Sequence, residues 1–238
     1  MRIGGLQKTS VIDFPGRLAC TVFTVGCNFV CPFCHNKSLV DGKGIELIDE
    51  NYFFEFLKKR KNILEGVCIT GGEPTLQVEL ADFCRKIKAM GLAVKLDTNG
   101  SRPEVLEKLL AGGFLDMVAM DVKNCFSKYR KTIQVESQKF KVESWVKKSI
   151  KMILESGLEY EFRTTVVPRM HNGDSLIQLA EELKELGGKE TIWVLQKFRA
   201  NENCLDKRYR KMKSFSDEEM EGFLRGAREV LPKTTLRE

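Results

Sequence analysis

Three cysteines lie close together near the beginning of the chain, in a spacing that suits metal chemistry. Cys27, Cys31 and Cys34 follow a C-x3-C-x2-C pattern. Three thiolates in so short a loop can surround a metal ion or an iron–sulfur cluster. A four-iron cluster held by three cysteines keeps one iron without a protein ligand, and that iron can bind a substrate. The spacing therefore favours an iron–sulfur site with one open position.

Structural zinc is the competing interpretation, with His35 as the fourth ligand. His35 is adjacent to Cys34, however, and neighbouring residues rarely turn both side chains onto one tetrahedral metal. Structural zinc sites also usually contain two separated ligand pairs, and the sequence has no second pair. The iron–sulfur cluster is favoured, and zinc stays as the alternative.

Glycine and polar residues stand at the ends of three later apolar runs. The first group is the motif Gly71-Gly72-Glu73-Pro74, whose glycines would let the backbone approach a ligand closely. The second is Asp97-Thr98-Asn99, and the third contains Asp121 and Lys123. Side chains two positions apart on a strand point to the same face. Asp121 and Lys123 could therefore form an ion pair or bind a ligand together.

The elements that must position these residues alternate between two patterns. Apolar runs rich in Val, Ile, Thr and Phe predict buried parallel strands at residues 18–25, 66–70, 93–97, 117–121, 160–166 and 191–196. Helix-period stripes follow, most clearly at residues 80–90, 142–154, 176–186 and 220–227. Six strand-then-helix units predict an α/β fold with parallel strands. A six-unit partial barrel and a doubly wound sheet both fit this pattern.

The chain shows no linker or low-complexity tract, so one main domain is expected over residues 18–238. Residues 1–17 are predicted to be an N-terminal leader that ends in a turn. Asp49 and Ser216 are predicted N-caps of helices. Residues 124–139 are polar and are predicted to form a flexible loop.

Parallel α/β proteins gather their functional groups at the carboxyl ends of the strands. The cysteine loop and the polar groups described above all follow predicted strands, so one shared site is expected there. Arg163, on the fifth strand, could clamp a carboxylate or form an internal salt bridge. Gln196 ends the sixth strand. His171 lies in a polar turn and is expected to be solvated.

The composition is that of an ordinary globular protein, with 42% hydrophobic and 30% charged residues and a net charge of +6. No run is long enough to span a membrane and no secretory signal is visible, so a cytoplasmic location is expected. Cys20, Cys68 and Cys84 lie in apolar segments and are expected in the core, while the roles of Cys125 and Cys204 are left open.

Two basic runs, at residues 58–61 and 207–213, are expected to be solvated surfaces. They could also receive an acidic electron-transfer partner. Nucleic acid is not expected as a partner.

The stretch from Gly26 to Asn36, GCNFVCPFCHN, resembles the signature of radical S-adenosylmethionine (SAM) enzymes. The match is strongest to the activases of glycyl-radical enzymes. Within these it looks most similar to the activating proteins of anaerobic ribonucleoside-triphosphate reductase, whose beginning also resembles residues 5–10 and 13–16. The resemblance covers most of the chain and thins after about Gln196.

The resemblance implies a partial (β/α)6 TIM-like barrel of the radical SAM type. It implies a [4Fe–4S] cluster held by Cys27, Cys31 and Cys34, whose open iron chelates SAM. Reductive cleavage of SAM would give a 5′-deoxyadenosyl radical, which would install a glycyl radical on a partner enzyme. Phe33 would meet the adenine, and Gln196 stands where better-known activases carry histidine near the ribose. The full set of implied cofactor-binding residues is Phe33, His35, Gly71, Gly72, Glu73, Asp97, Thr98, Asn99, Asp121, Lys123, Arg163 and Gln196.

The implied partners are a glycyl-radical enzyme and an electron donor, either reduced flavodoxin or ferredoxin. Anaerobic ribonucleotide reductase is the favoured target, and pyruvate formate-lyase stays open. Two further interpretations are kept. A radical enzyme of similar length could act on a small molecule, as a 7-deazapurine-forming synthase does. A non-catalytic zinc or electron-transfer protein would not bind SAM.

Overall fold

The computed structural model describes residues 1–134 and 141–237 of the chain. Its eight strands form one sheet in the sequential order β1 to β8, in which β1 pairs antiparallel to β2 and every later pair is parallel. Within the described residues β1 and β8 are the two edges, so the sheet does not close into a full barrel. The strands are β1 (Ile3–Ser10), β2 (Ala19–Thr24), β3 (Gly66–Gly71), β4 (Ala93–Thr98), β5 (Met117–Asp121), β6 (Glu159–Val166), β7 (Trp193–Lys197) and β8 (Thr235–Arg237).

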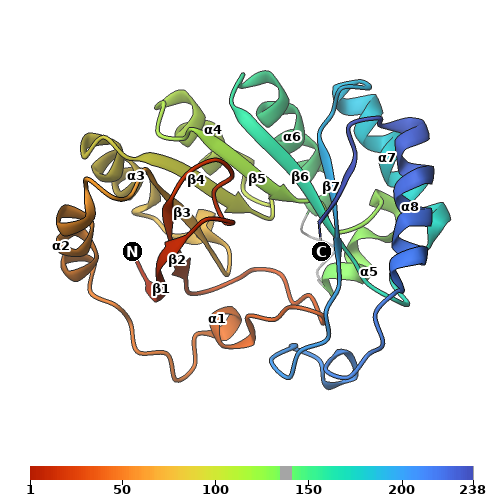
Figure 1. Cartoon of the computed structure of the whole chain (residues 1–238), viewed down its shortest axis with the longest axis horizontal. Helices are drawn as coiled ribbons and strands as arrows, with labels where there is room; N and C mark the ends of the chain where they lie inside the picture. The colour runs from red at the N-terminus through yellow and green to blue at the C-terminus, as the bar shows by residue number, and fades with distance from the viewer. Residues whose placement is uncertain (135–140, 238) are drawn as a thin grey trace.

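Six longer helices follow one another around the outer side of this sheet (Figure 1). They are α2 (Glu50–Arg60), α3 (Leu80–Ala89), α4 (Pro103–Ala111), α6 (Val142–Glu155), α7 (Gly173–Gly187) and α8 (Asp217–Val230). Two short helices, α1 (Lys37–Asp41) and α5 (Tyr129–Ile133), lie at the end where β2 and β5 lead out of the sheet. The predicted α/β partial barrel is confirmed, and β2 to β7 are the six predicted strands.

One hydrophobic core joins the sheet to the helices. Phe53, Phe83 and Trp193 are fully buried in it, and Phe53 and Phe83 stack with ring centroids 5.1 Å apart. The predicted N-caps are also confirmed. The side chain of Asp49 accepts hydrogen bonds from the backbone at the start of α2, and Ser216 forms a capping box with Glu219 at the start of α8.

Residues 3–10, placed in the predicted leader, form β1 and pair with β2, so this part of the leader belongs to the sheet. Gly4 lies within β1 and is required there by packing. A Cβ added at Gly4 would lie 2.5 Å from Cγ2 of Val25, so only glycine fits there. The short edge strand β8 is likewise absent from the predicted set.

The prediction of a flexible loop over residues 124–139 is wrong for its first part. A 3-10 turn, η2 (Phe126–Lys128), leads into α5, and Tyr129 and Ile133 are fully buried. The amide of Asn124 donates to Oγ1 of Thr132 over 2.9 Å and fixes this segment. Residues 135–139 lie outside the described residues.

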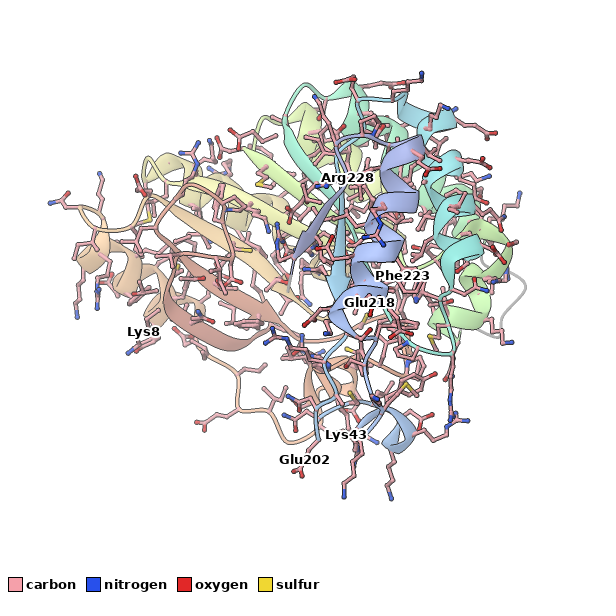
Figure 2. All side chains as sticks on the ribbon, turned by 45° about the vertical axis from the view of Figure 1, so that its right-hand side comes forward. Lys8, Lys43, Glu202, Glu218, Phe223 and Arg228 are labelled. Atoms are coloured by element: carbon pink, nitrogen blue, oxygen red, sulfur yellow. The ribbon has the colours of Figure 1, made fainter. Side chains whose placement is uncertain are left out.

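No helix among the described residues is long and apolar enough to cross a membrane. Figure 2 places Lys43, which follows α1, and Glu202, which follows β7, at the same end of the molecule. Backbone hydrogen bonds join the cysteine loop to the segment after β7.

Candidate active site

The cysteine loop leaves the end of β2 and is held by backbone hydrogen bonds from three directions. The amide of Gly26 donates to the carbonyl of Leu39 in α1 over 2.7 Å. The amide of Val30 donates to the carbonyl of Ile133 in α5 over 3.1 Å. From the segment after β7, the amide of Leu205 donates to the carbonyl of Cys34 over 2.9 Å. The loop is thus fixed before any ligand binds.

The three thiols lie at different depths, with Cys31 buried and Cys27 and Cys34 half-buried. For Cys27 and Cys31, burial is the strongest influence on protonation, and it raises the pKa of Cys27 to about 11 and that of Cys31 to about 12. The Lys123 ammonium acts in the opposite direction on both thiols. Iron binding must therefore displace protons from these thiols.

A cavity of about 230 Å³ lies between the cysteine loop and the carboxyl ends of β3, β4 and β5. Most of the predicted site residues line it, whereas Arg163 and Gln196 do not. Four lining residues were not predicted, namely Phe29, Asn36, Thr70 and Thr165. The predicted residues in the lining are Cys27, Cys31, Phe33, Cys34, His35, Gly71, Gly72, Glu73, Asp97, Thr98, Asn99, Asp121 and Lys123.

The unpredicted lining residues carry weak sequence signals. Thr70 and Thr165 each stand near the carboxyl end of a predicted strand, so the position of the strand end could have revealed them. Asn28 is also part of the site's framework. Its amide donates to Oγ of Ser101 over 2.7 Å, and its Oδ1 accepts from Asn99 over 3.0 Å. Only the fold brings these residues together.

The two motif glycines are required by close backbone contacts. Gly71 has a φ of +116°, and a Cβ there would lie 2.3 Å from the backbone nitrogen of Thr24. A Cβ at Gly72 would lie 2.1 Å from the carbonyl oxygen of Gly26, which directly precedes Cys27. These glycines thus seat the β3 turn against the start of the cysteine loop.

Glu73 is fully buried, and its carboxylate ties the β3 turn to the end of β4. One carboxylate oxygen accepts from Oγ1 of Thr98 and the other from the backbone amide of Asn99, each over 2.7 Å. Thr75 donates to it from both its amide and its hydroxyl. Burial raises the pKa of Glu73, although these hydrogen bonds act in the opposite direction. Its carboxylate is therefore occupied by the protein's own donors.

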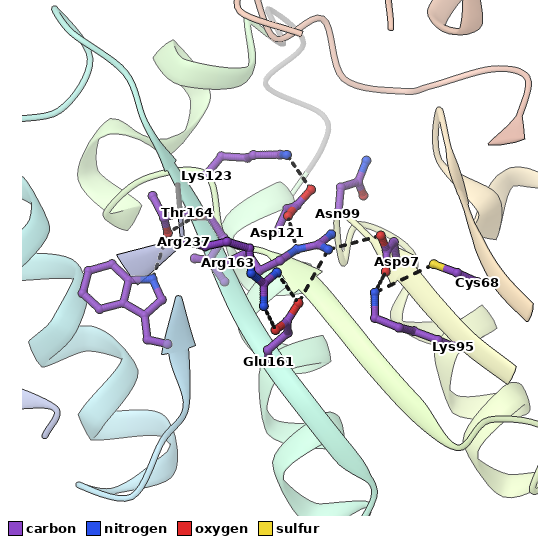
Figure 3. A network of polar contacts seen from close by, with 12 residues as sticks. Cys68, Lys95, Asp97, Asn99, Asp121, Lys123, Glu161, Arg163, Thr164 and Arg237 are labelled. Atoms are coloured by element: carbon purple, nitrogen blue, oxygen red, sulfur yellow. Dashed lines mark hydrogen bonds and ion pairs between the residues drawn. The ribbon is translucent and has the colours of Figure 1, made fainter. Parts of the chain in front are cut away.

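The predicted salt-bridge alternative is confirmed for Arg163, which lies at the centre of an internal ion-pair network (Figure 3). Its Nη1 lies 3.2 Å from Oδ2 of Asp97, and its Nε lies 3.0 Å from Oδ1 of Asp121. The other oxygen of Asp121 accepts from Nζ of Lys123 over 2.9 Å. Asp97 also pairs with the buried Lys95.

These charges fix the protonation states at the cavity wall. Burial alone would raise the pKa of Asp121, but Arg163 and Lys123 hold it well below its usual range. The Asp121 carboxylate in turn raises the pKa of Lys123 against the opposing effect of burial. Asp121 and Lys123 form the pair expected from their spacing, and both still line the cavity.

His171 differs from its prediction. It is buried, with 4% of its surface exposed, rather than solvated. The backbone amide of Val167 donates to Nδ1 over 3.0 Å, so Nε2 carries the proton and lies 2.9 Å from the carbonyl oxygen of Lys123. His171 thus supports the backbone of a cavity residue. Its polar neighbours in the sequence gave no sign of this.

The remaining cysteines are free thiols in the protein interior. Cys20, Cys68 and Cys84 are fully buried, as predicted. Cys125 and Cys204 are fully buried too, although they follow strands in irregular segments. The Sγ of Cys204 lies 3.9 Å from the carbonyl oxygen of Phe33, so this thiol packs directly against the cysteine loop.

The donor set around the cavity fits an iron–sulfur cluster, because three thiols border one space. Backbone, carboxylate and ammonium groups line the rest of it. A cluster with an open iron and a zwitterionic ligand could both be held there.

The family model described as the radical SAM superfamily matches residues 21–183, which is more than half of the chain. The chain belongs to the radical SAM superfamily. It is therefore a radical SAM enzyme, with a [4Fe–4S] cluster and SAM as its cofactors.

The chain is also similar to several named activating enzymes. A protein of Methanocaldococcus jannaschii, named as an inferred glycyl-radical enzyme activating enzyme, is 28% identical over 99% of this chain and 95% of its own. The pyruvate formate-lyase-activating enzyme of Clostridium pasteurianum is 24% identical over 82% of this chain and 81% of its own. That of Listeria monocytogenes is 33% identical, but over only 51% of this chain and 53% of its own.

Solved structures share the fold of this chain. SuiB of Streptococcus suis bound to S-adenosylmethionine matches 90% of this chain with a TM-score of 0.68 and 14% identity. A radical SAM methyltransferase from Sphaerobacter thermophilus matches 94% of it with a TM-score of 0.67 and 15% identity. This chain spans about half of SuiB and two thirds of the methyltransferase, covering 49% and 67% of them.

Proposed function

We propose that this enzyme activates a glycyl-radical enzyme by installing a radical on a backbone glycine of its partner. The observation that carries the proposal is the similarity to an inferred glycyl-radical enzyme activating enzyme over 99% of the chain. The similarity to a pyruvate formate-lyase-activating enzyme over 82% of the chain supports the same class.

In this proposal, the thiolates of Cys27, Cys31 and Cys34 hold the cluster beside the cavity. When bound, the reduced cluster and SAM supply a 5′-deoxyadenosyl radical. The backbone at Gly71-Gly72 approaches the methionyl part of SAM, and the Asp121–Lys123 pair offers it a carboxylate and an ammonium. Phe33, which is buried and lines the cavity, packs on the adenine.

Glu73, Asp97, Thr98 and Asn99 belong to the same proposed SAM site, where they act in different ways. Glu73 accepts hydrogen bonds from Thr98 and Asn99 and so fixes the ends of β3 and β4. Asp97 and Arg163 act through the ion-pair network, which holds Asp121 and Lys123 in place. Prearranged groups of this kind need little reorganisation when a ligand binds.

The open sheet supports a polypeptide substrate. Within the described residues β1 and β8 do not pair, so the strands do not enclose the cavity on all sides. A loop of a partner protein could reach the cavity from the open side and bring a glycine next to SAM. Residues that exclude water from the cavity would protect the radical.

Within this class, we propose anaerobic ribonucleoside-triphosphate reductase as the partner, on the resemblance of residues 5–10 and 13–16. Pyruvate formate-lyase is the second choice. Reduced flavodoxin or ferredoxin is proposed as the electron donor, and a cytoplasmic location stays a prediction.

The test is to mix the reduced enzyme, SAM and an anaerobic ribonucleotide reductase under argon, and to record the electron paramagnetic resonance spectrum. A glycyl-radical doublet is expected, and it should be absent with Cys31→Ala. Pyruvate formate-lyase in parallel distinguishes the two partners. If 5′-deoxyadenosine forms but neither protein acquires a doublet, the activase proposal is wrong.

A small-molecule substrate would then be favoured. One observation supports that alternative, since a protein of Pyrococcus horikoshii named as an inferred GTP 3′,8-cyclase is 29% identical over 54% of this chain and 41% of its own.

A further inference from the structure

A second pocket of about 280 Å³ opens beside the cluster cavity. Its lining comes from the loop after Cys34, from the carboxyl ends of β6 and β7, and from β8. His35 and Thr165 line both spaces, so the two adjoin. The complete lining is His35, Thr165, Gln196, Lys197, Arg199 and Arg237.

The pocket is strongly basic. Three of its six lining residues are cations, and no acidic residue lines it among those the structure describes. Arg199 is exposed and makes no ion pair with any described residue. Lys197 pairs with Asp217, but Asp217 is 82% exposed, so water screens this contact and a ligand could replace it. The pocket therefore has cationic groups available to an anion.

Arg237 is held in a fixed orientation. Both of its terminal nitrogens bond the carboxylate of Glu161, over 3.1 Å and 2.7 Å, and the Glu161 side chain is only 6% exposed. Nη1 of Arg163 lies 3.7 Å from the same carboxylate. Figure 3 shows this arrangement, in which Glu161 joins Arg237 to the network around Asp97 and Asp121.

The Arg237 side chain is nevertheless 42% exposed, so part of the guanidinium faces outward. A donor that is already oriented loses little freedom when it binds an anion. The neighbouring Gln196, Thr165 and His35 add polar groups that can complete the hydrogen bonding of a carboxylate.

We propose that this pocket binds a carboxylate of the substrate while the reacting part of the substrate lies in the cluster cavity. Because His35 and Thr165 line both the pocket and the cluster cavity, the two spaces adjoin and one ligand can reach both. If the substrate is a partner protein, the carboxylate belongs to an acidic side chain a few residues from the reacting glycine. In this respect the inference rests on the proposed function. A free small carboxylate has the same chemistry and is the other source.

The test uses two blocked nine-residue peptides that differ only in charge. Each has a central glycine deuterated at Cα, with Glu two residues away on both sides in one peptide and Gln in the other. The reconstituted, reduced enzyme is given SAM and each peptide, and deuterium in 5′-deoxyadenosine is measured by mass spectrometry. Arg199→Gln is the test variant, because the exposed Arg199 contributes no described ion pair to the fold.

The matched control is Lys233→Gln, since Lys233 is an exposed cation just before β8 that lies outside the pocket and pairs with Glu190. The wild type should be half-saturated by the Glu peptide at a concentration about tenfold lower than by the Gln peptide. Lys233→Gln should keep this preference, and Arg199→Gln should lose it. Equal use of the two peptides by the wild type, or a preference that survives in Arg199→Gln, would overturn the proposal.

A separate arm distinguishes failure of the pocket from failure of the activase proposal. If neither peptide transfers deuterium, the peptide substrate is wrong, and glutarate is titrated as a free dicarboxylate. A saturable change in the rate of SAM cleavage, shifted at least about tenfold in concentration by Arg199→Gln, supports the pocket with a small carboxylate as its ligand. Absence of any glutarate effect on the wild type overturns the pocket as well.

Discussion

Gly72 and His171 act on the site through the backbone that they contact. Gly72 has no side chain because the carbonyl of Gly26 occupies the space that a Cβ would need. His171 lies 48 residues from Lys123 in the sequence, and its Nε2 contacts the carbonyl of that residue. Neither residue is a reactive group of the site, but each fixes a backbone segment that borders the cavity.

Gly72→Ala should disturb the cysteine loop itself, because a Cβ 2.1 Å from a carbonyl oxygen must push the two segments apart. Overpacking of this kind costs about 1–3 kcal/mol. Gly173→Ala is the control, since a Cβ there meets no atom within 4 Å. Iron content after anaerobic reconstitution should be about four per chain in the control and much lower in Gly72→Ala. Equal iron content in both variants would contradict this role.

His171 should make stability depend on pH. Burial lowers its pKa from 6.5 to about 4, so the unfolded chain binds more protons between these values. Stability should therefore fall as the pH falls from 6.5 to 4, by about 1.4 kcal/mol per unit at most, and the effect should level off below. Urea midpoints of the wild type and His171→Asn measure this. The variant should be less stable at pH 7 but should lack this slope.

The pH dependence of stability caused by His171 can be separated from that caused by Asp121. The pKa of Asp121 is depressed, so its stabilising contribution is present above its unfolded pKa of 3.8 and is lost only at lower pH. A slope between pH 6.5 and 4 that persists unchanged in His171→Asn would show that another group causes it.

The segment after β7 is the element that covers the cysteine loop. The amides of Leu205 and Asp206 donate to the carbonyls of Cys34 and Pro32, each over 2.9 Å. Tyr209 is 8% exposed and packs edge-on against Phe198, which contacts the ring of His35. The basic run 207–213 in this segment, for which a solvated surface was the favoured prediction, therefore also has a buried anchor in Tyr209.

Tyr209→Ala should loosen this cover. Truncating a buried aromatic residue costs about 3–5 kcal/mol, and much of this should appear as local opening of the segment. A chelator should then remove iron from the oxidised enzyme at least about tenfold faster than from the wild type. Tyr52→Ala in α2, where the side chain is 53% exposed, should leave the rate unchanged. Equal rates in the two variants would mean that the segment does not protect the cluster.

At the scale of the whole molecule, sequence patterns were sufficient to predict the parallel strands β2 to β7. Residues 18–25 and 66–70 are rich in apolar and β-branched side chains because both faces of a parallel sheet are covered, and this composition is local. The edge strands were missed because their pairing depends on distant partners. Ile3 in β1 pairs with Thr24, and Leu236 in β8 pairs with Leu195.

The candidate site was also predicted only in part from the sequence. The cysteine loop and the residues after β3, β4 and β5 share one cavity, as their positions at strand ends indicated. The sequence could not tell which polar groups face a ligand and which face each other. Arg163 was expected either to clamp a carboxylate or to form an internal salt bridge, and it pairs with Asp97 and Asp121. Glu73 was expected in the SAM site, and its carboxylate accepts hydrogen bonds from Thr98 and Asn99. Such pairings follow only from the three-dimensional fold.

We place the cluster and SAM in the cavity beside the cysteine loop, and one measurement tests this placement most directly. Wild type, Cys31→Ala and Cys84→Ala are reconstituted anaerobically, reduced and given SAM, and 5′-deoxyadenosine is quantified together with iron and zinc. Cys84 is the matched control because it is also buried but lies in α3 and does not line the cavity. Wild type and Cys84→Ala should hold about four irons per chain and form 5′-deoxyadenosine, whereas Cys31→Ala should do neither. Stoichiometric zinc in a folded, iron-free wild type, or undiminished cleavage by Cys31→Ala, would contradict the placement.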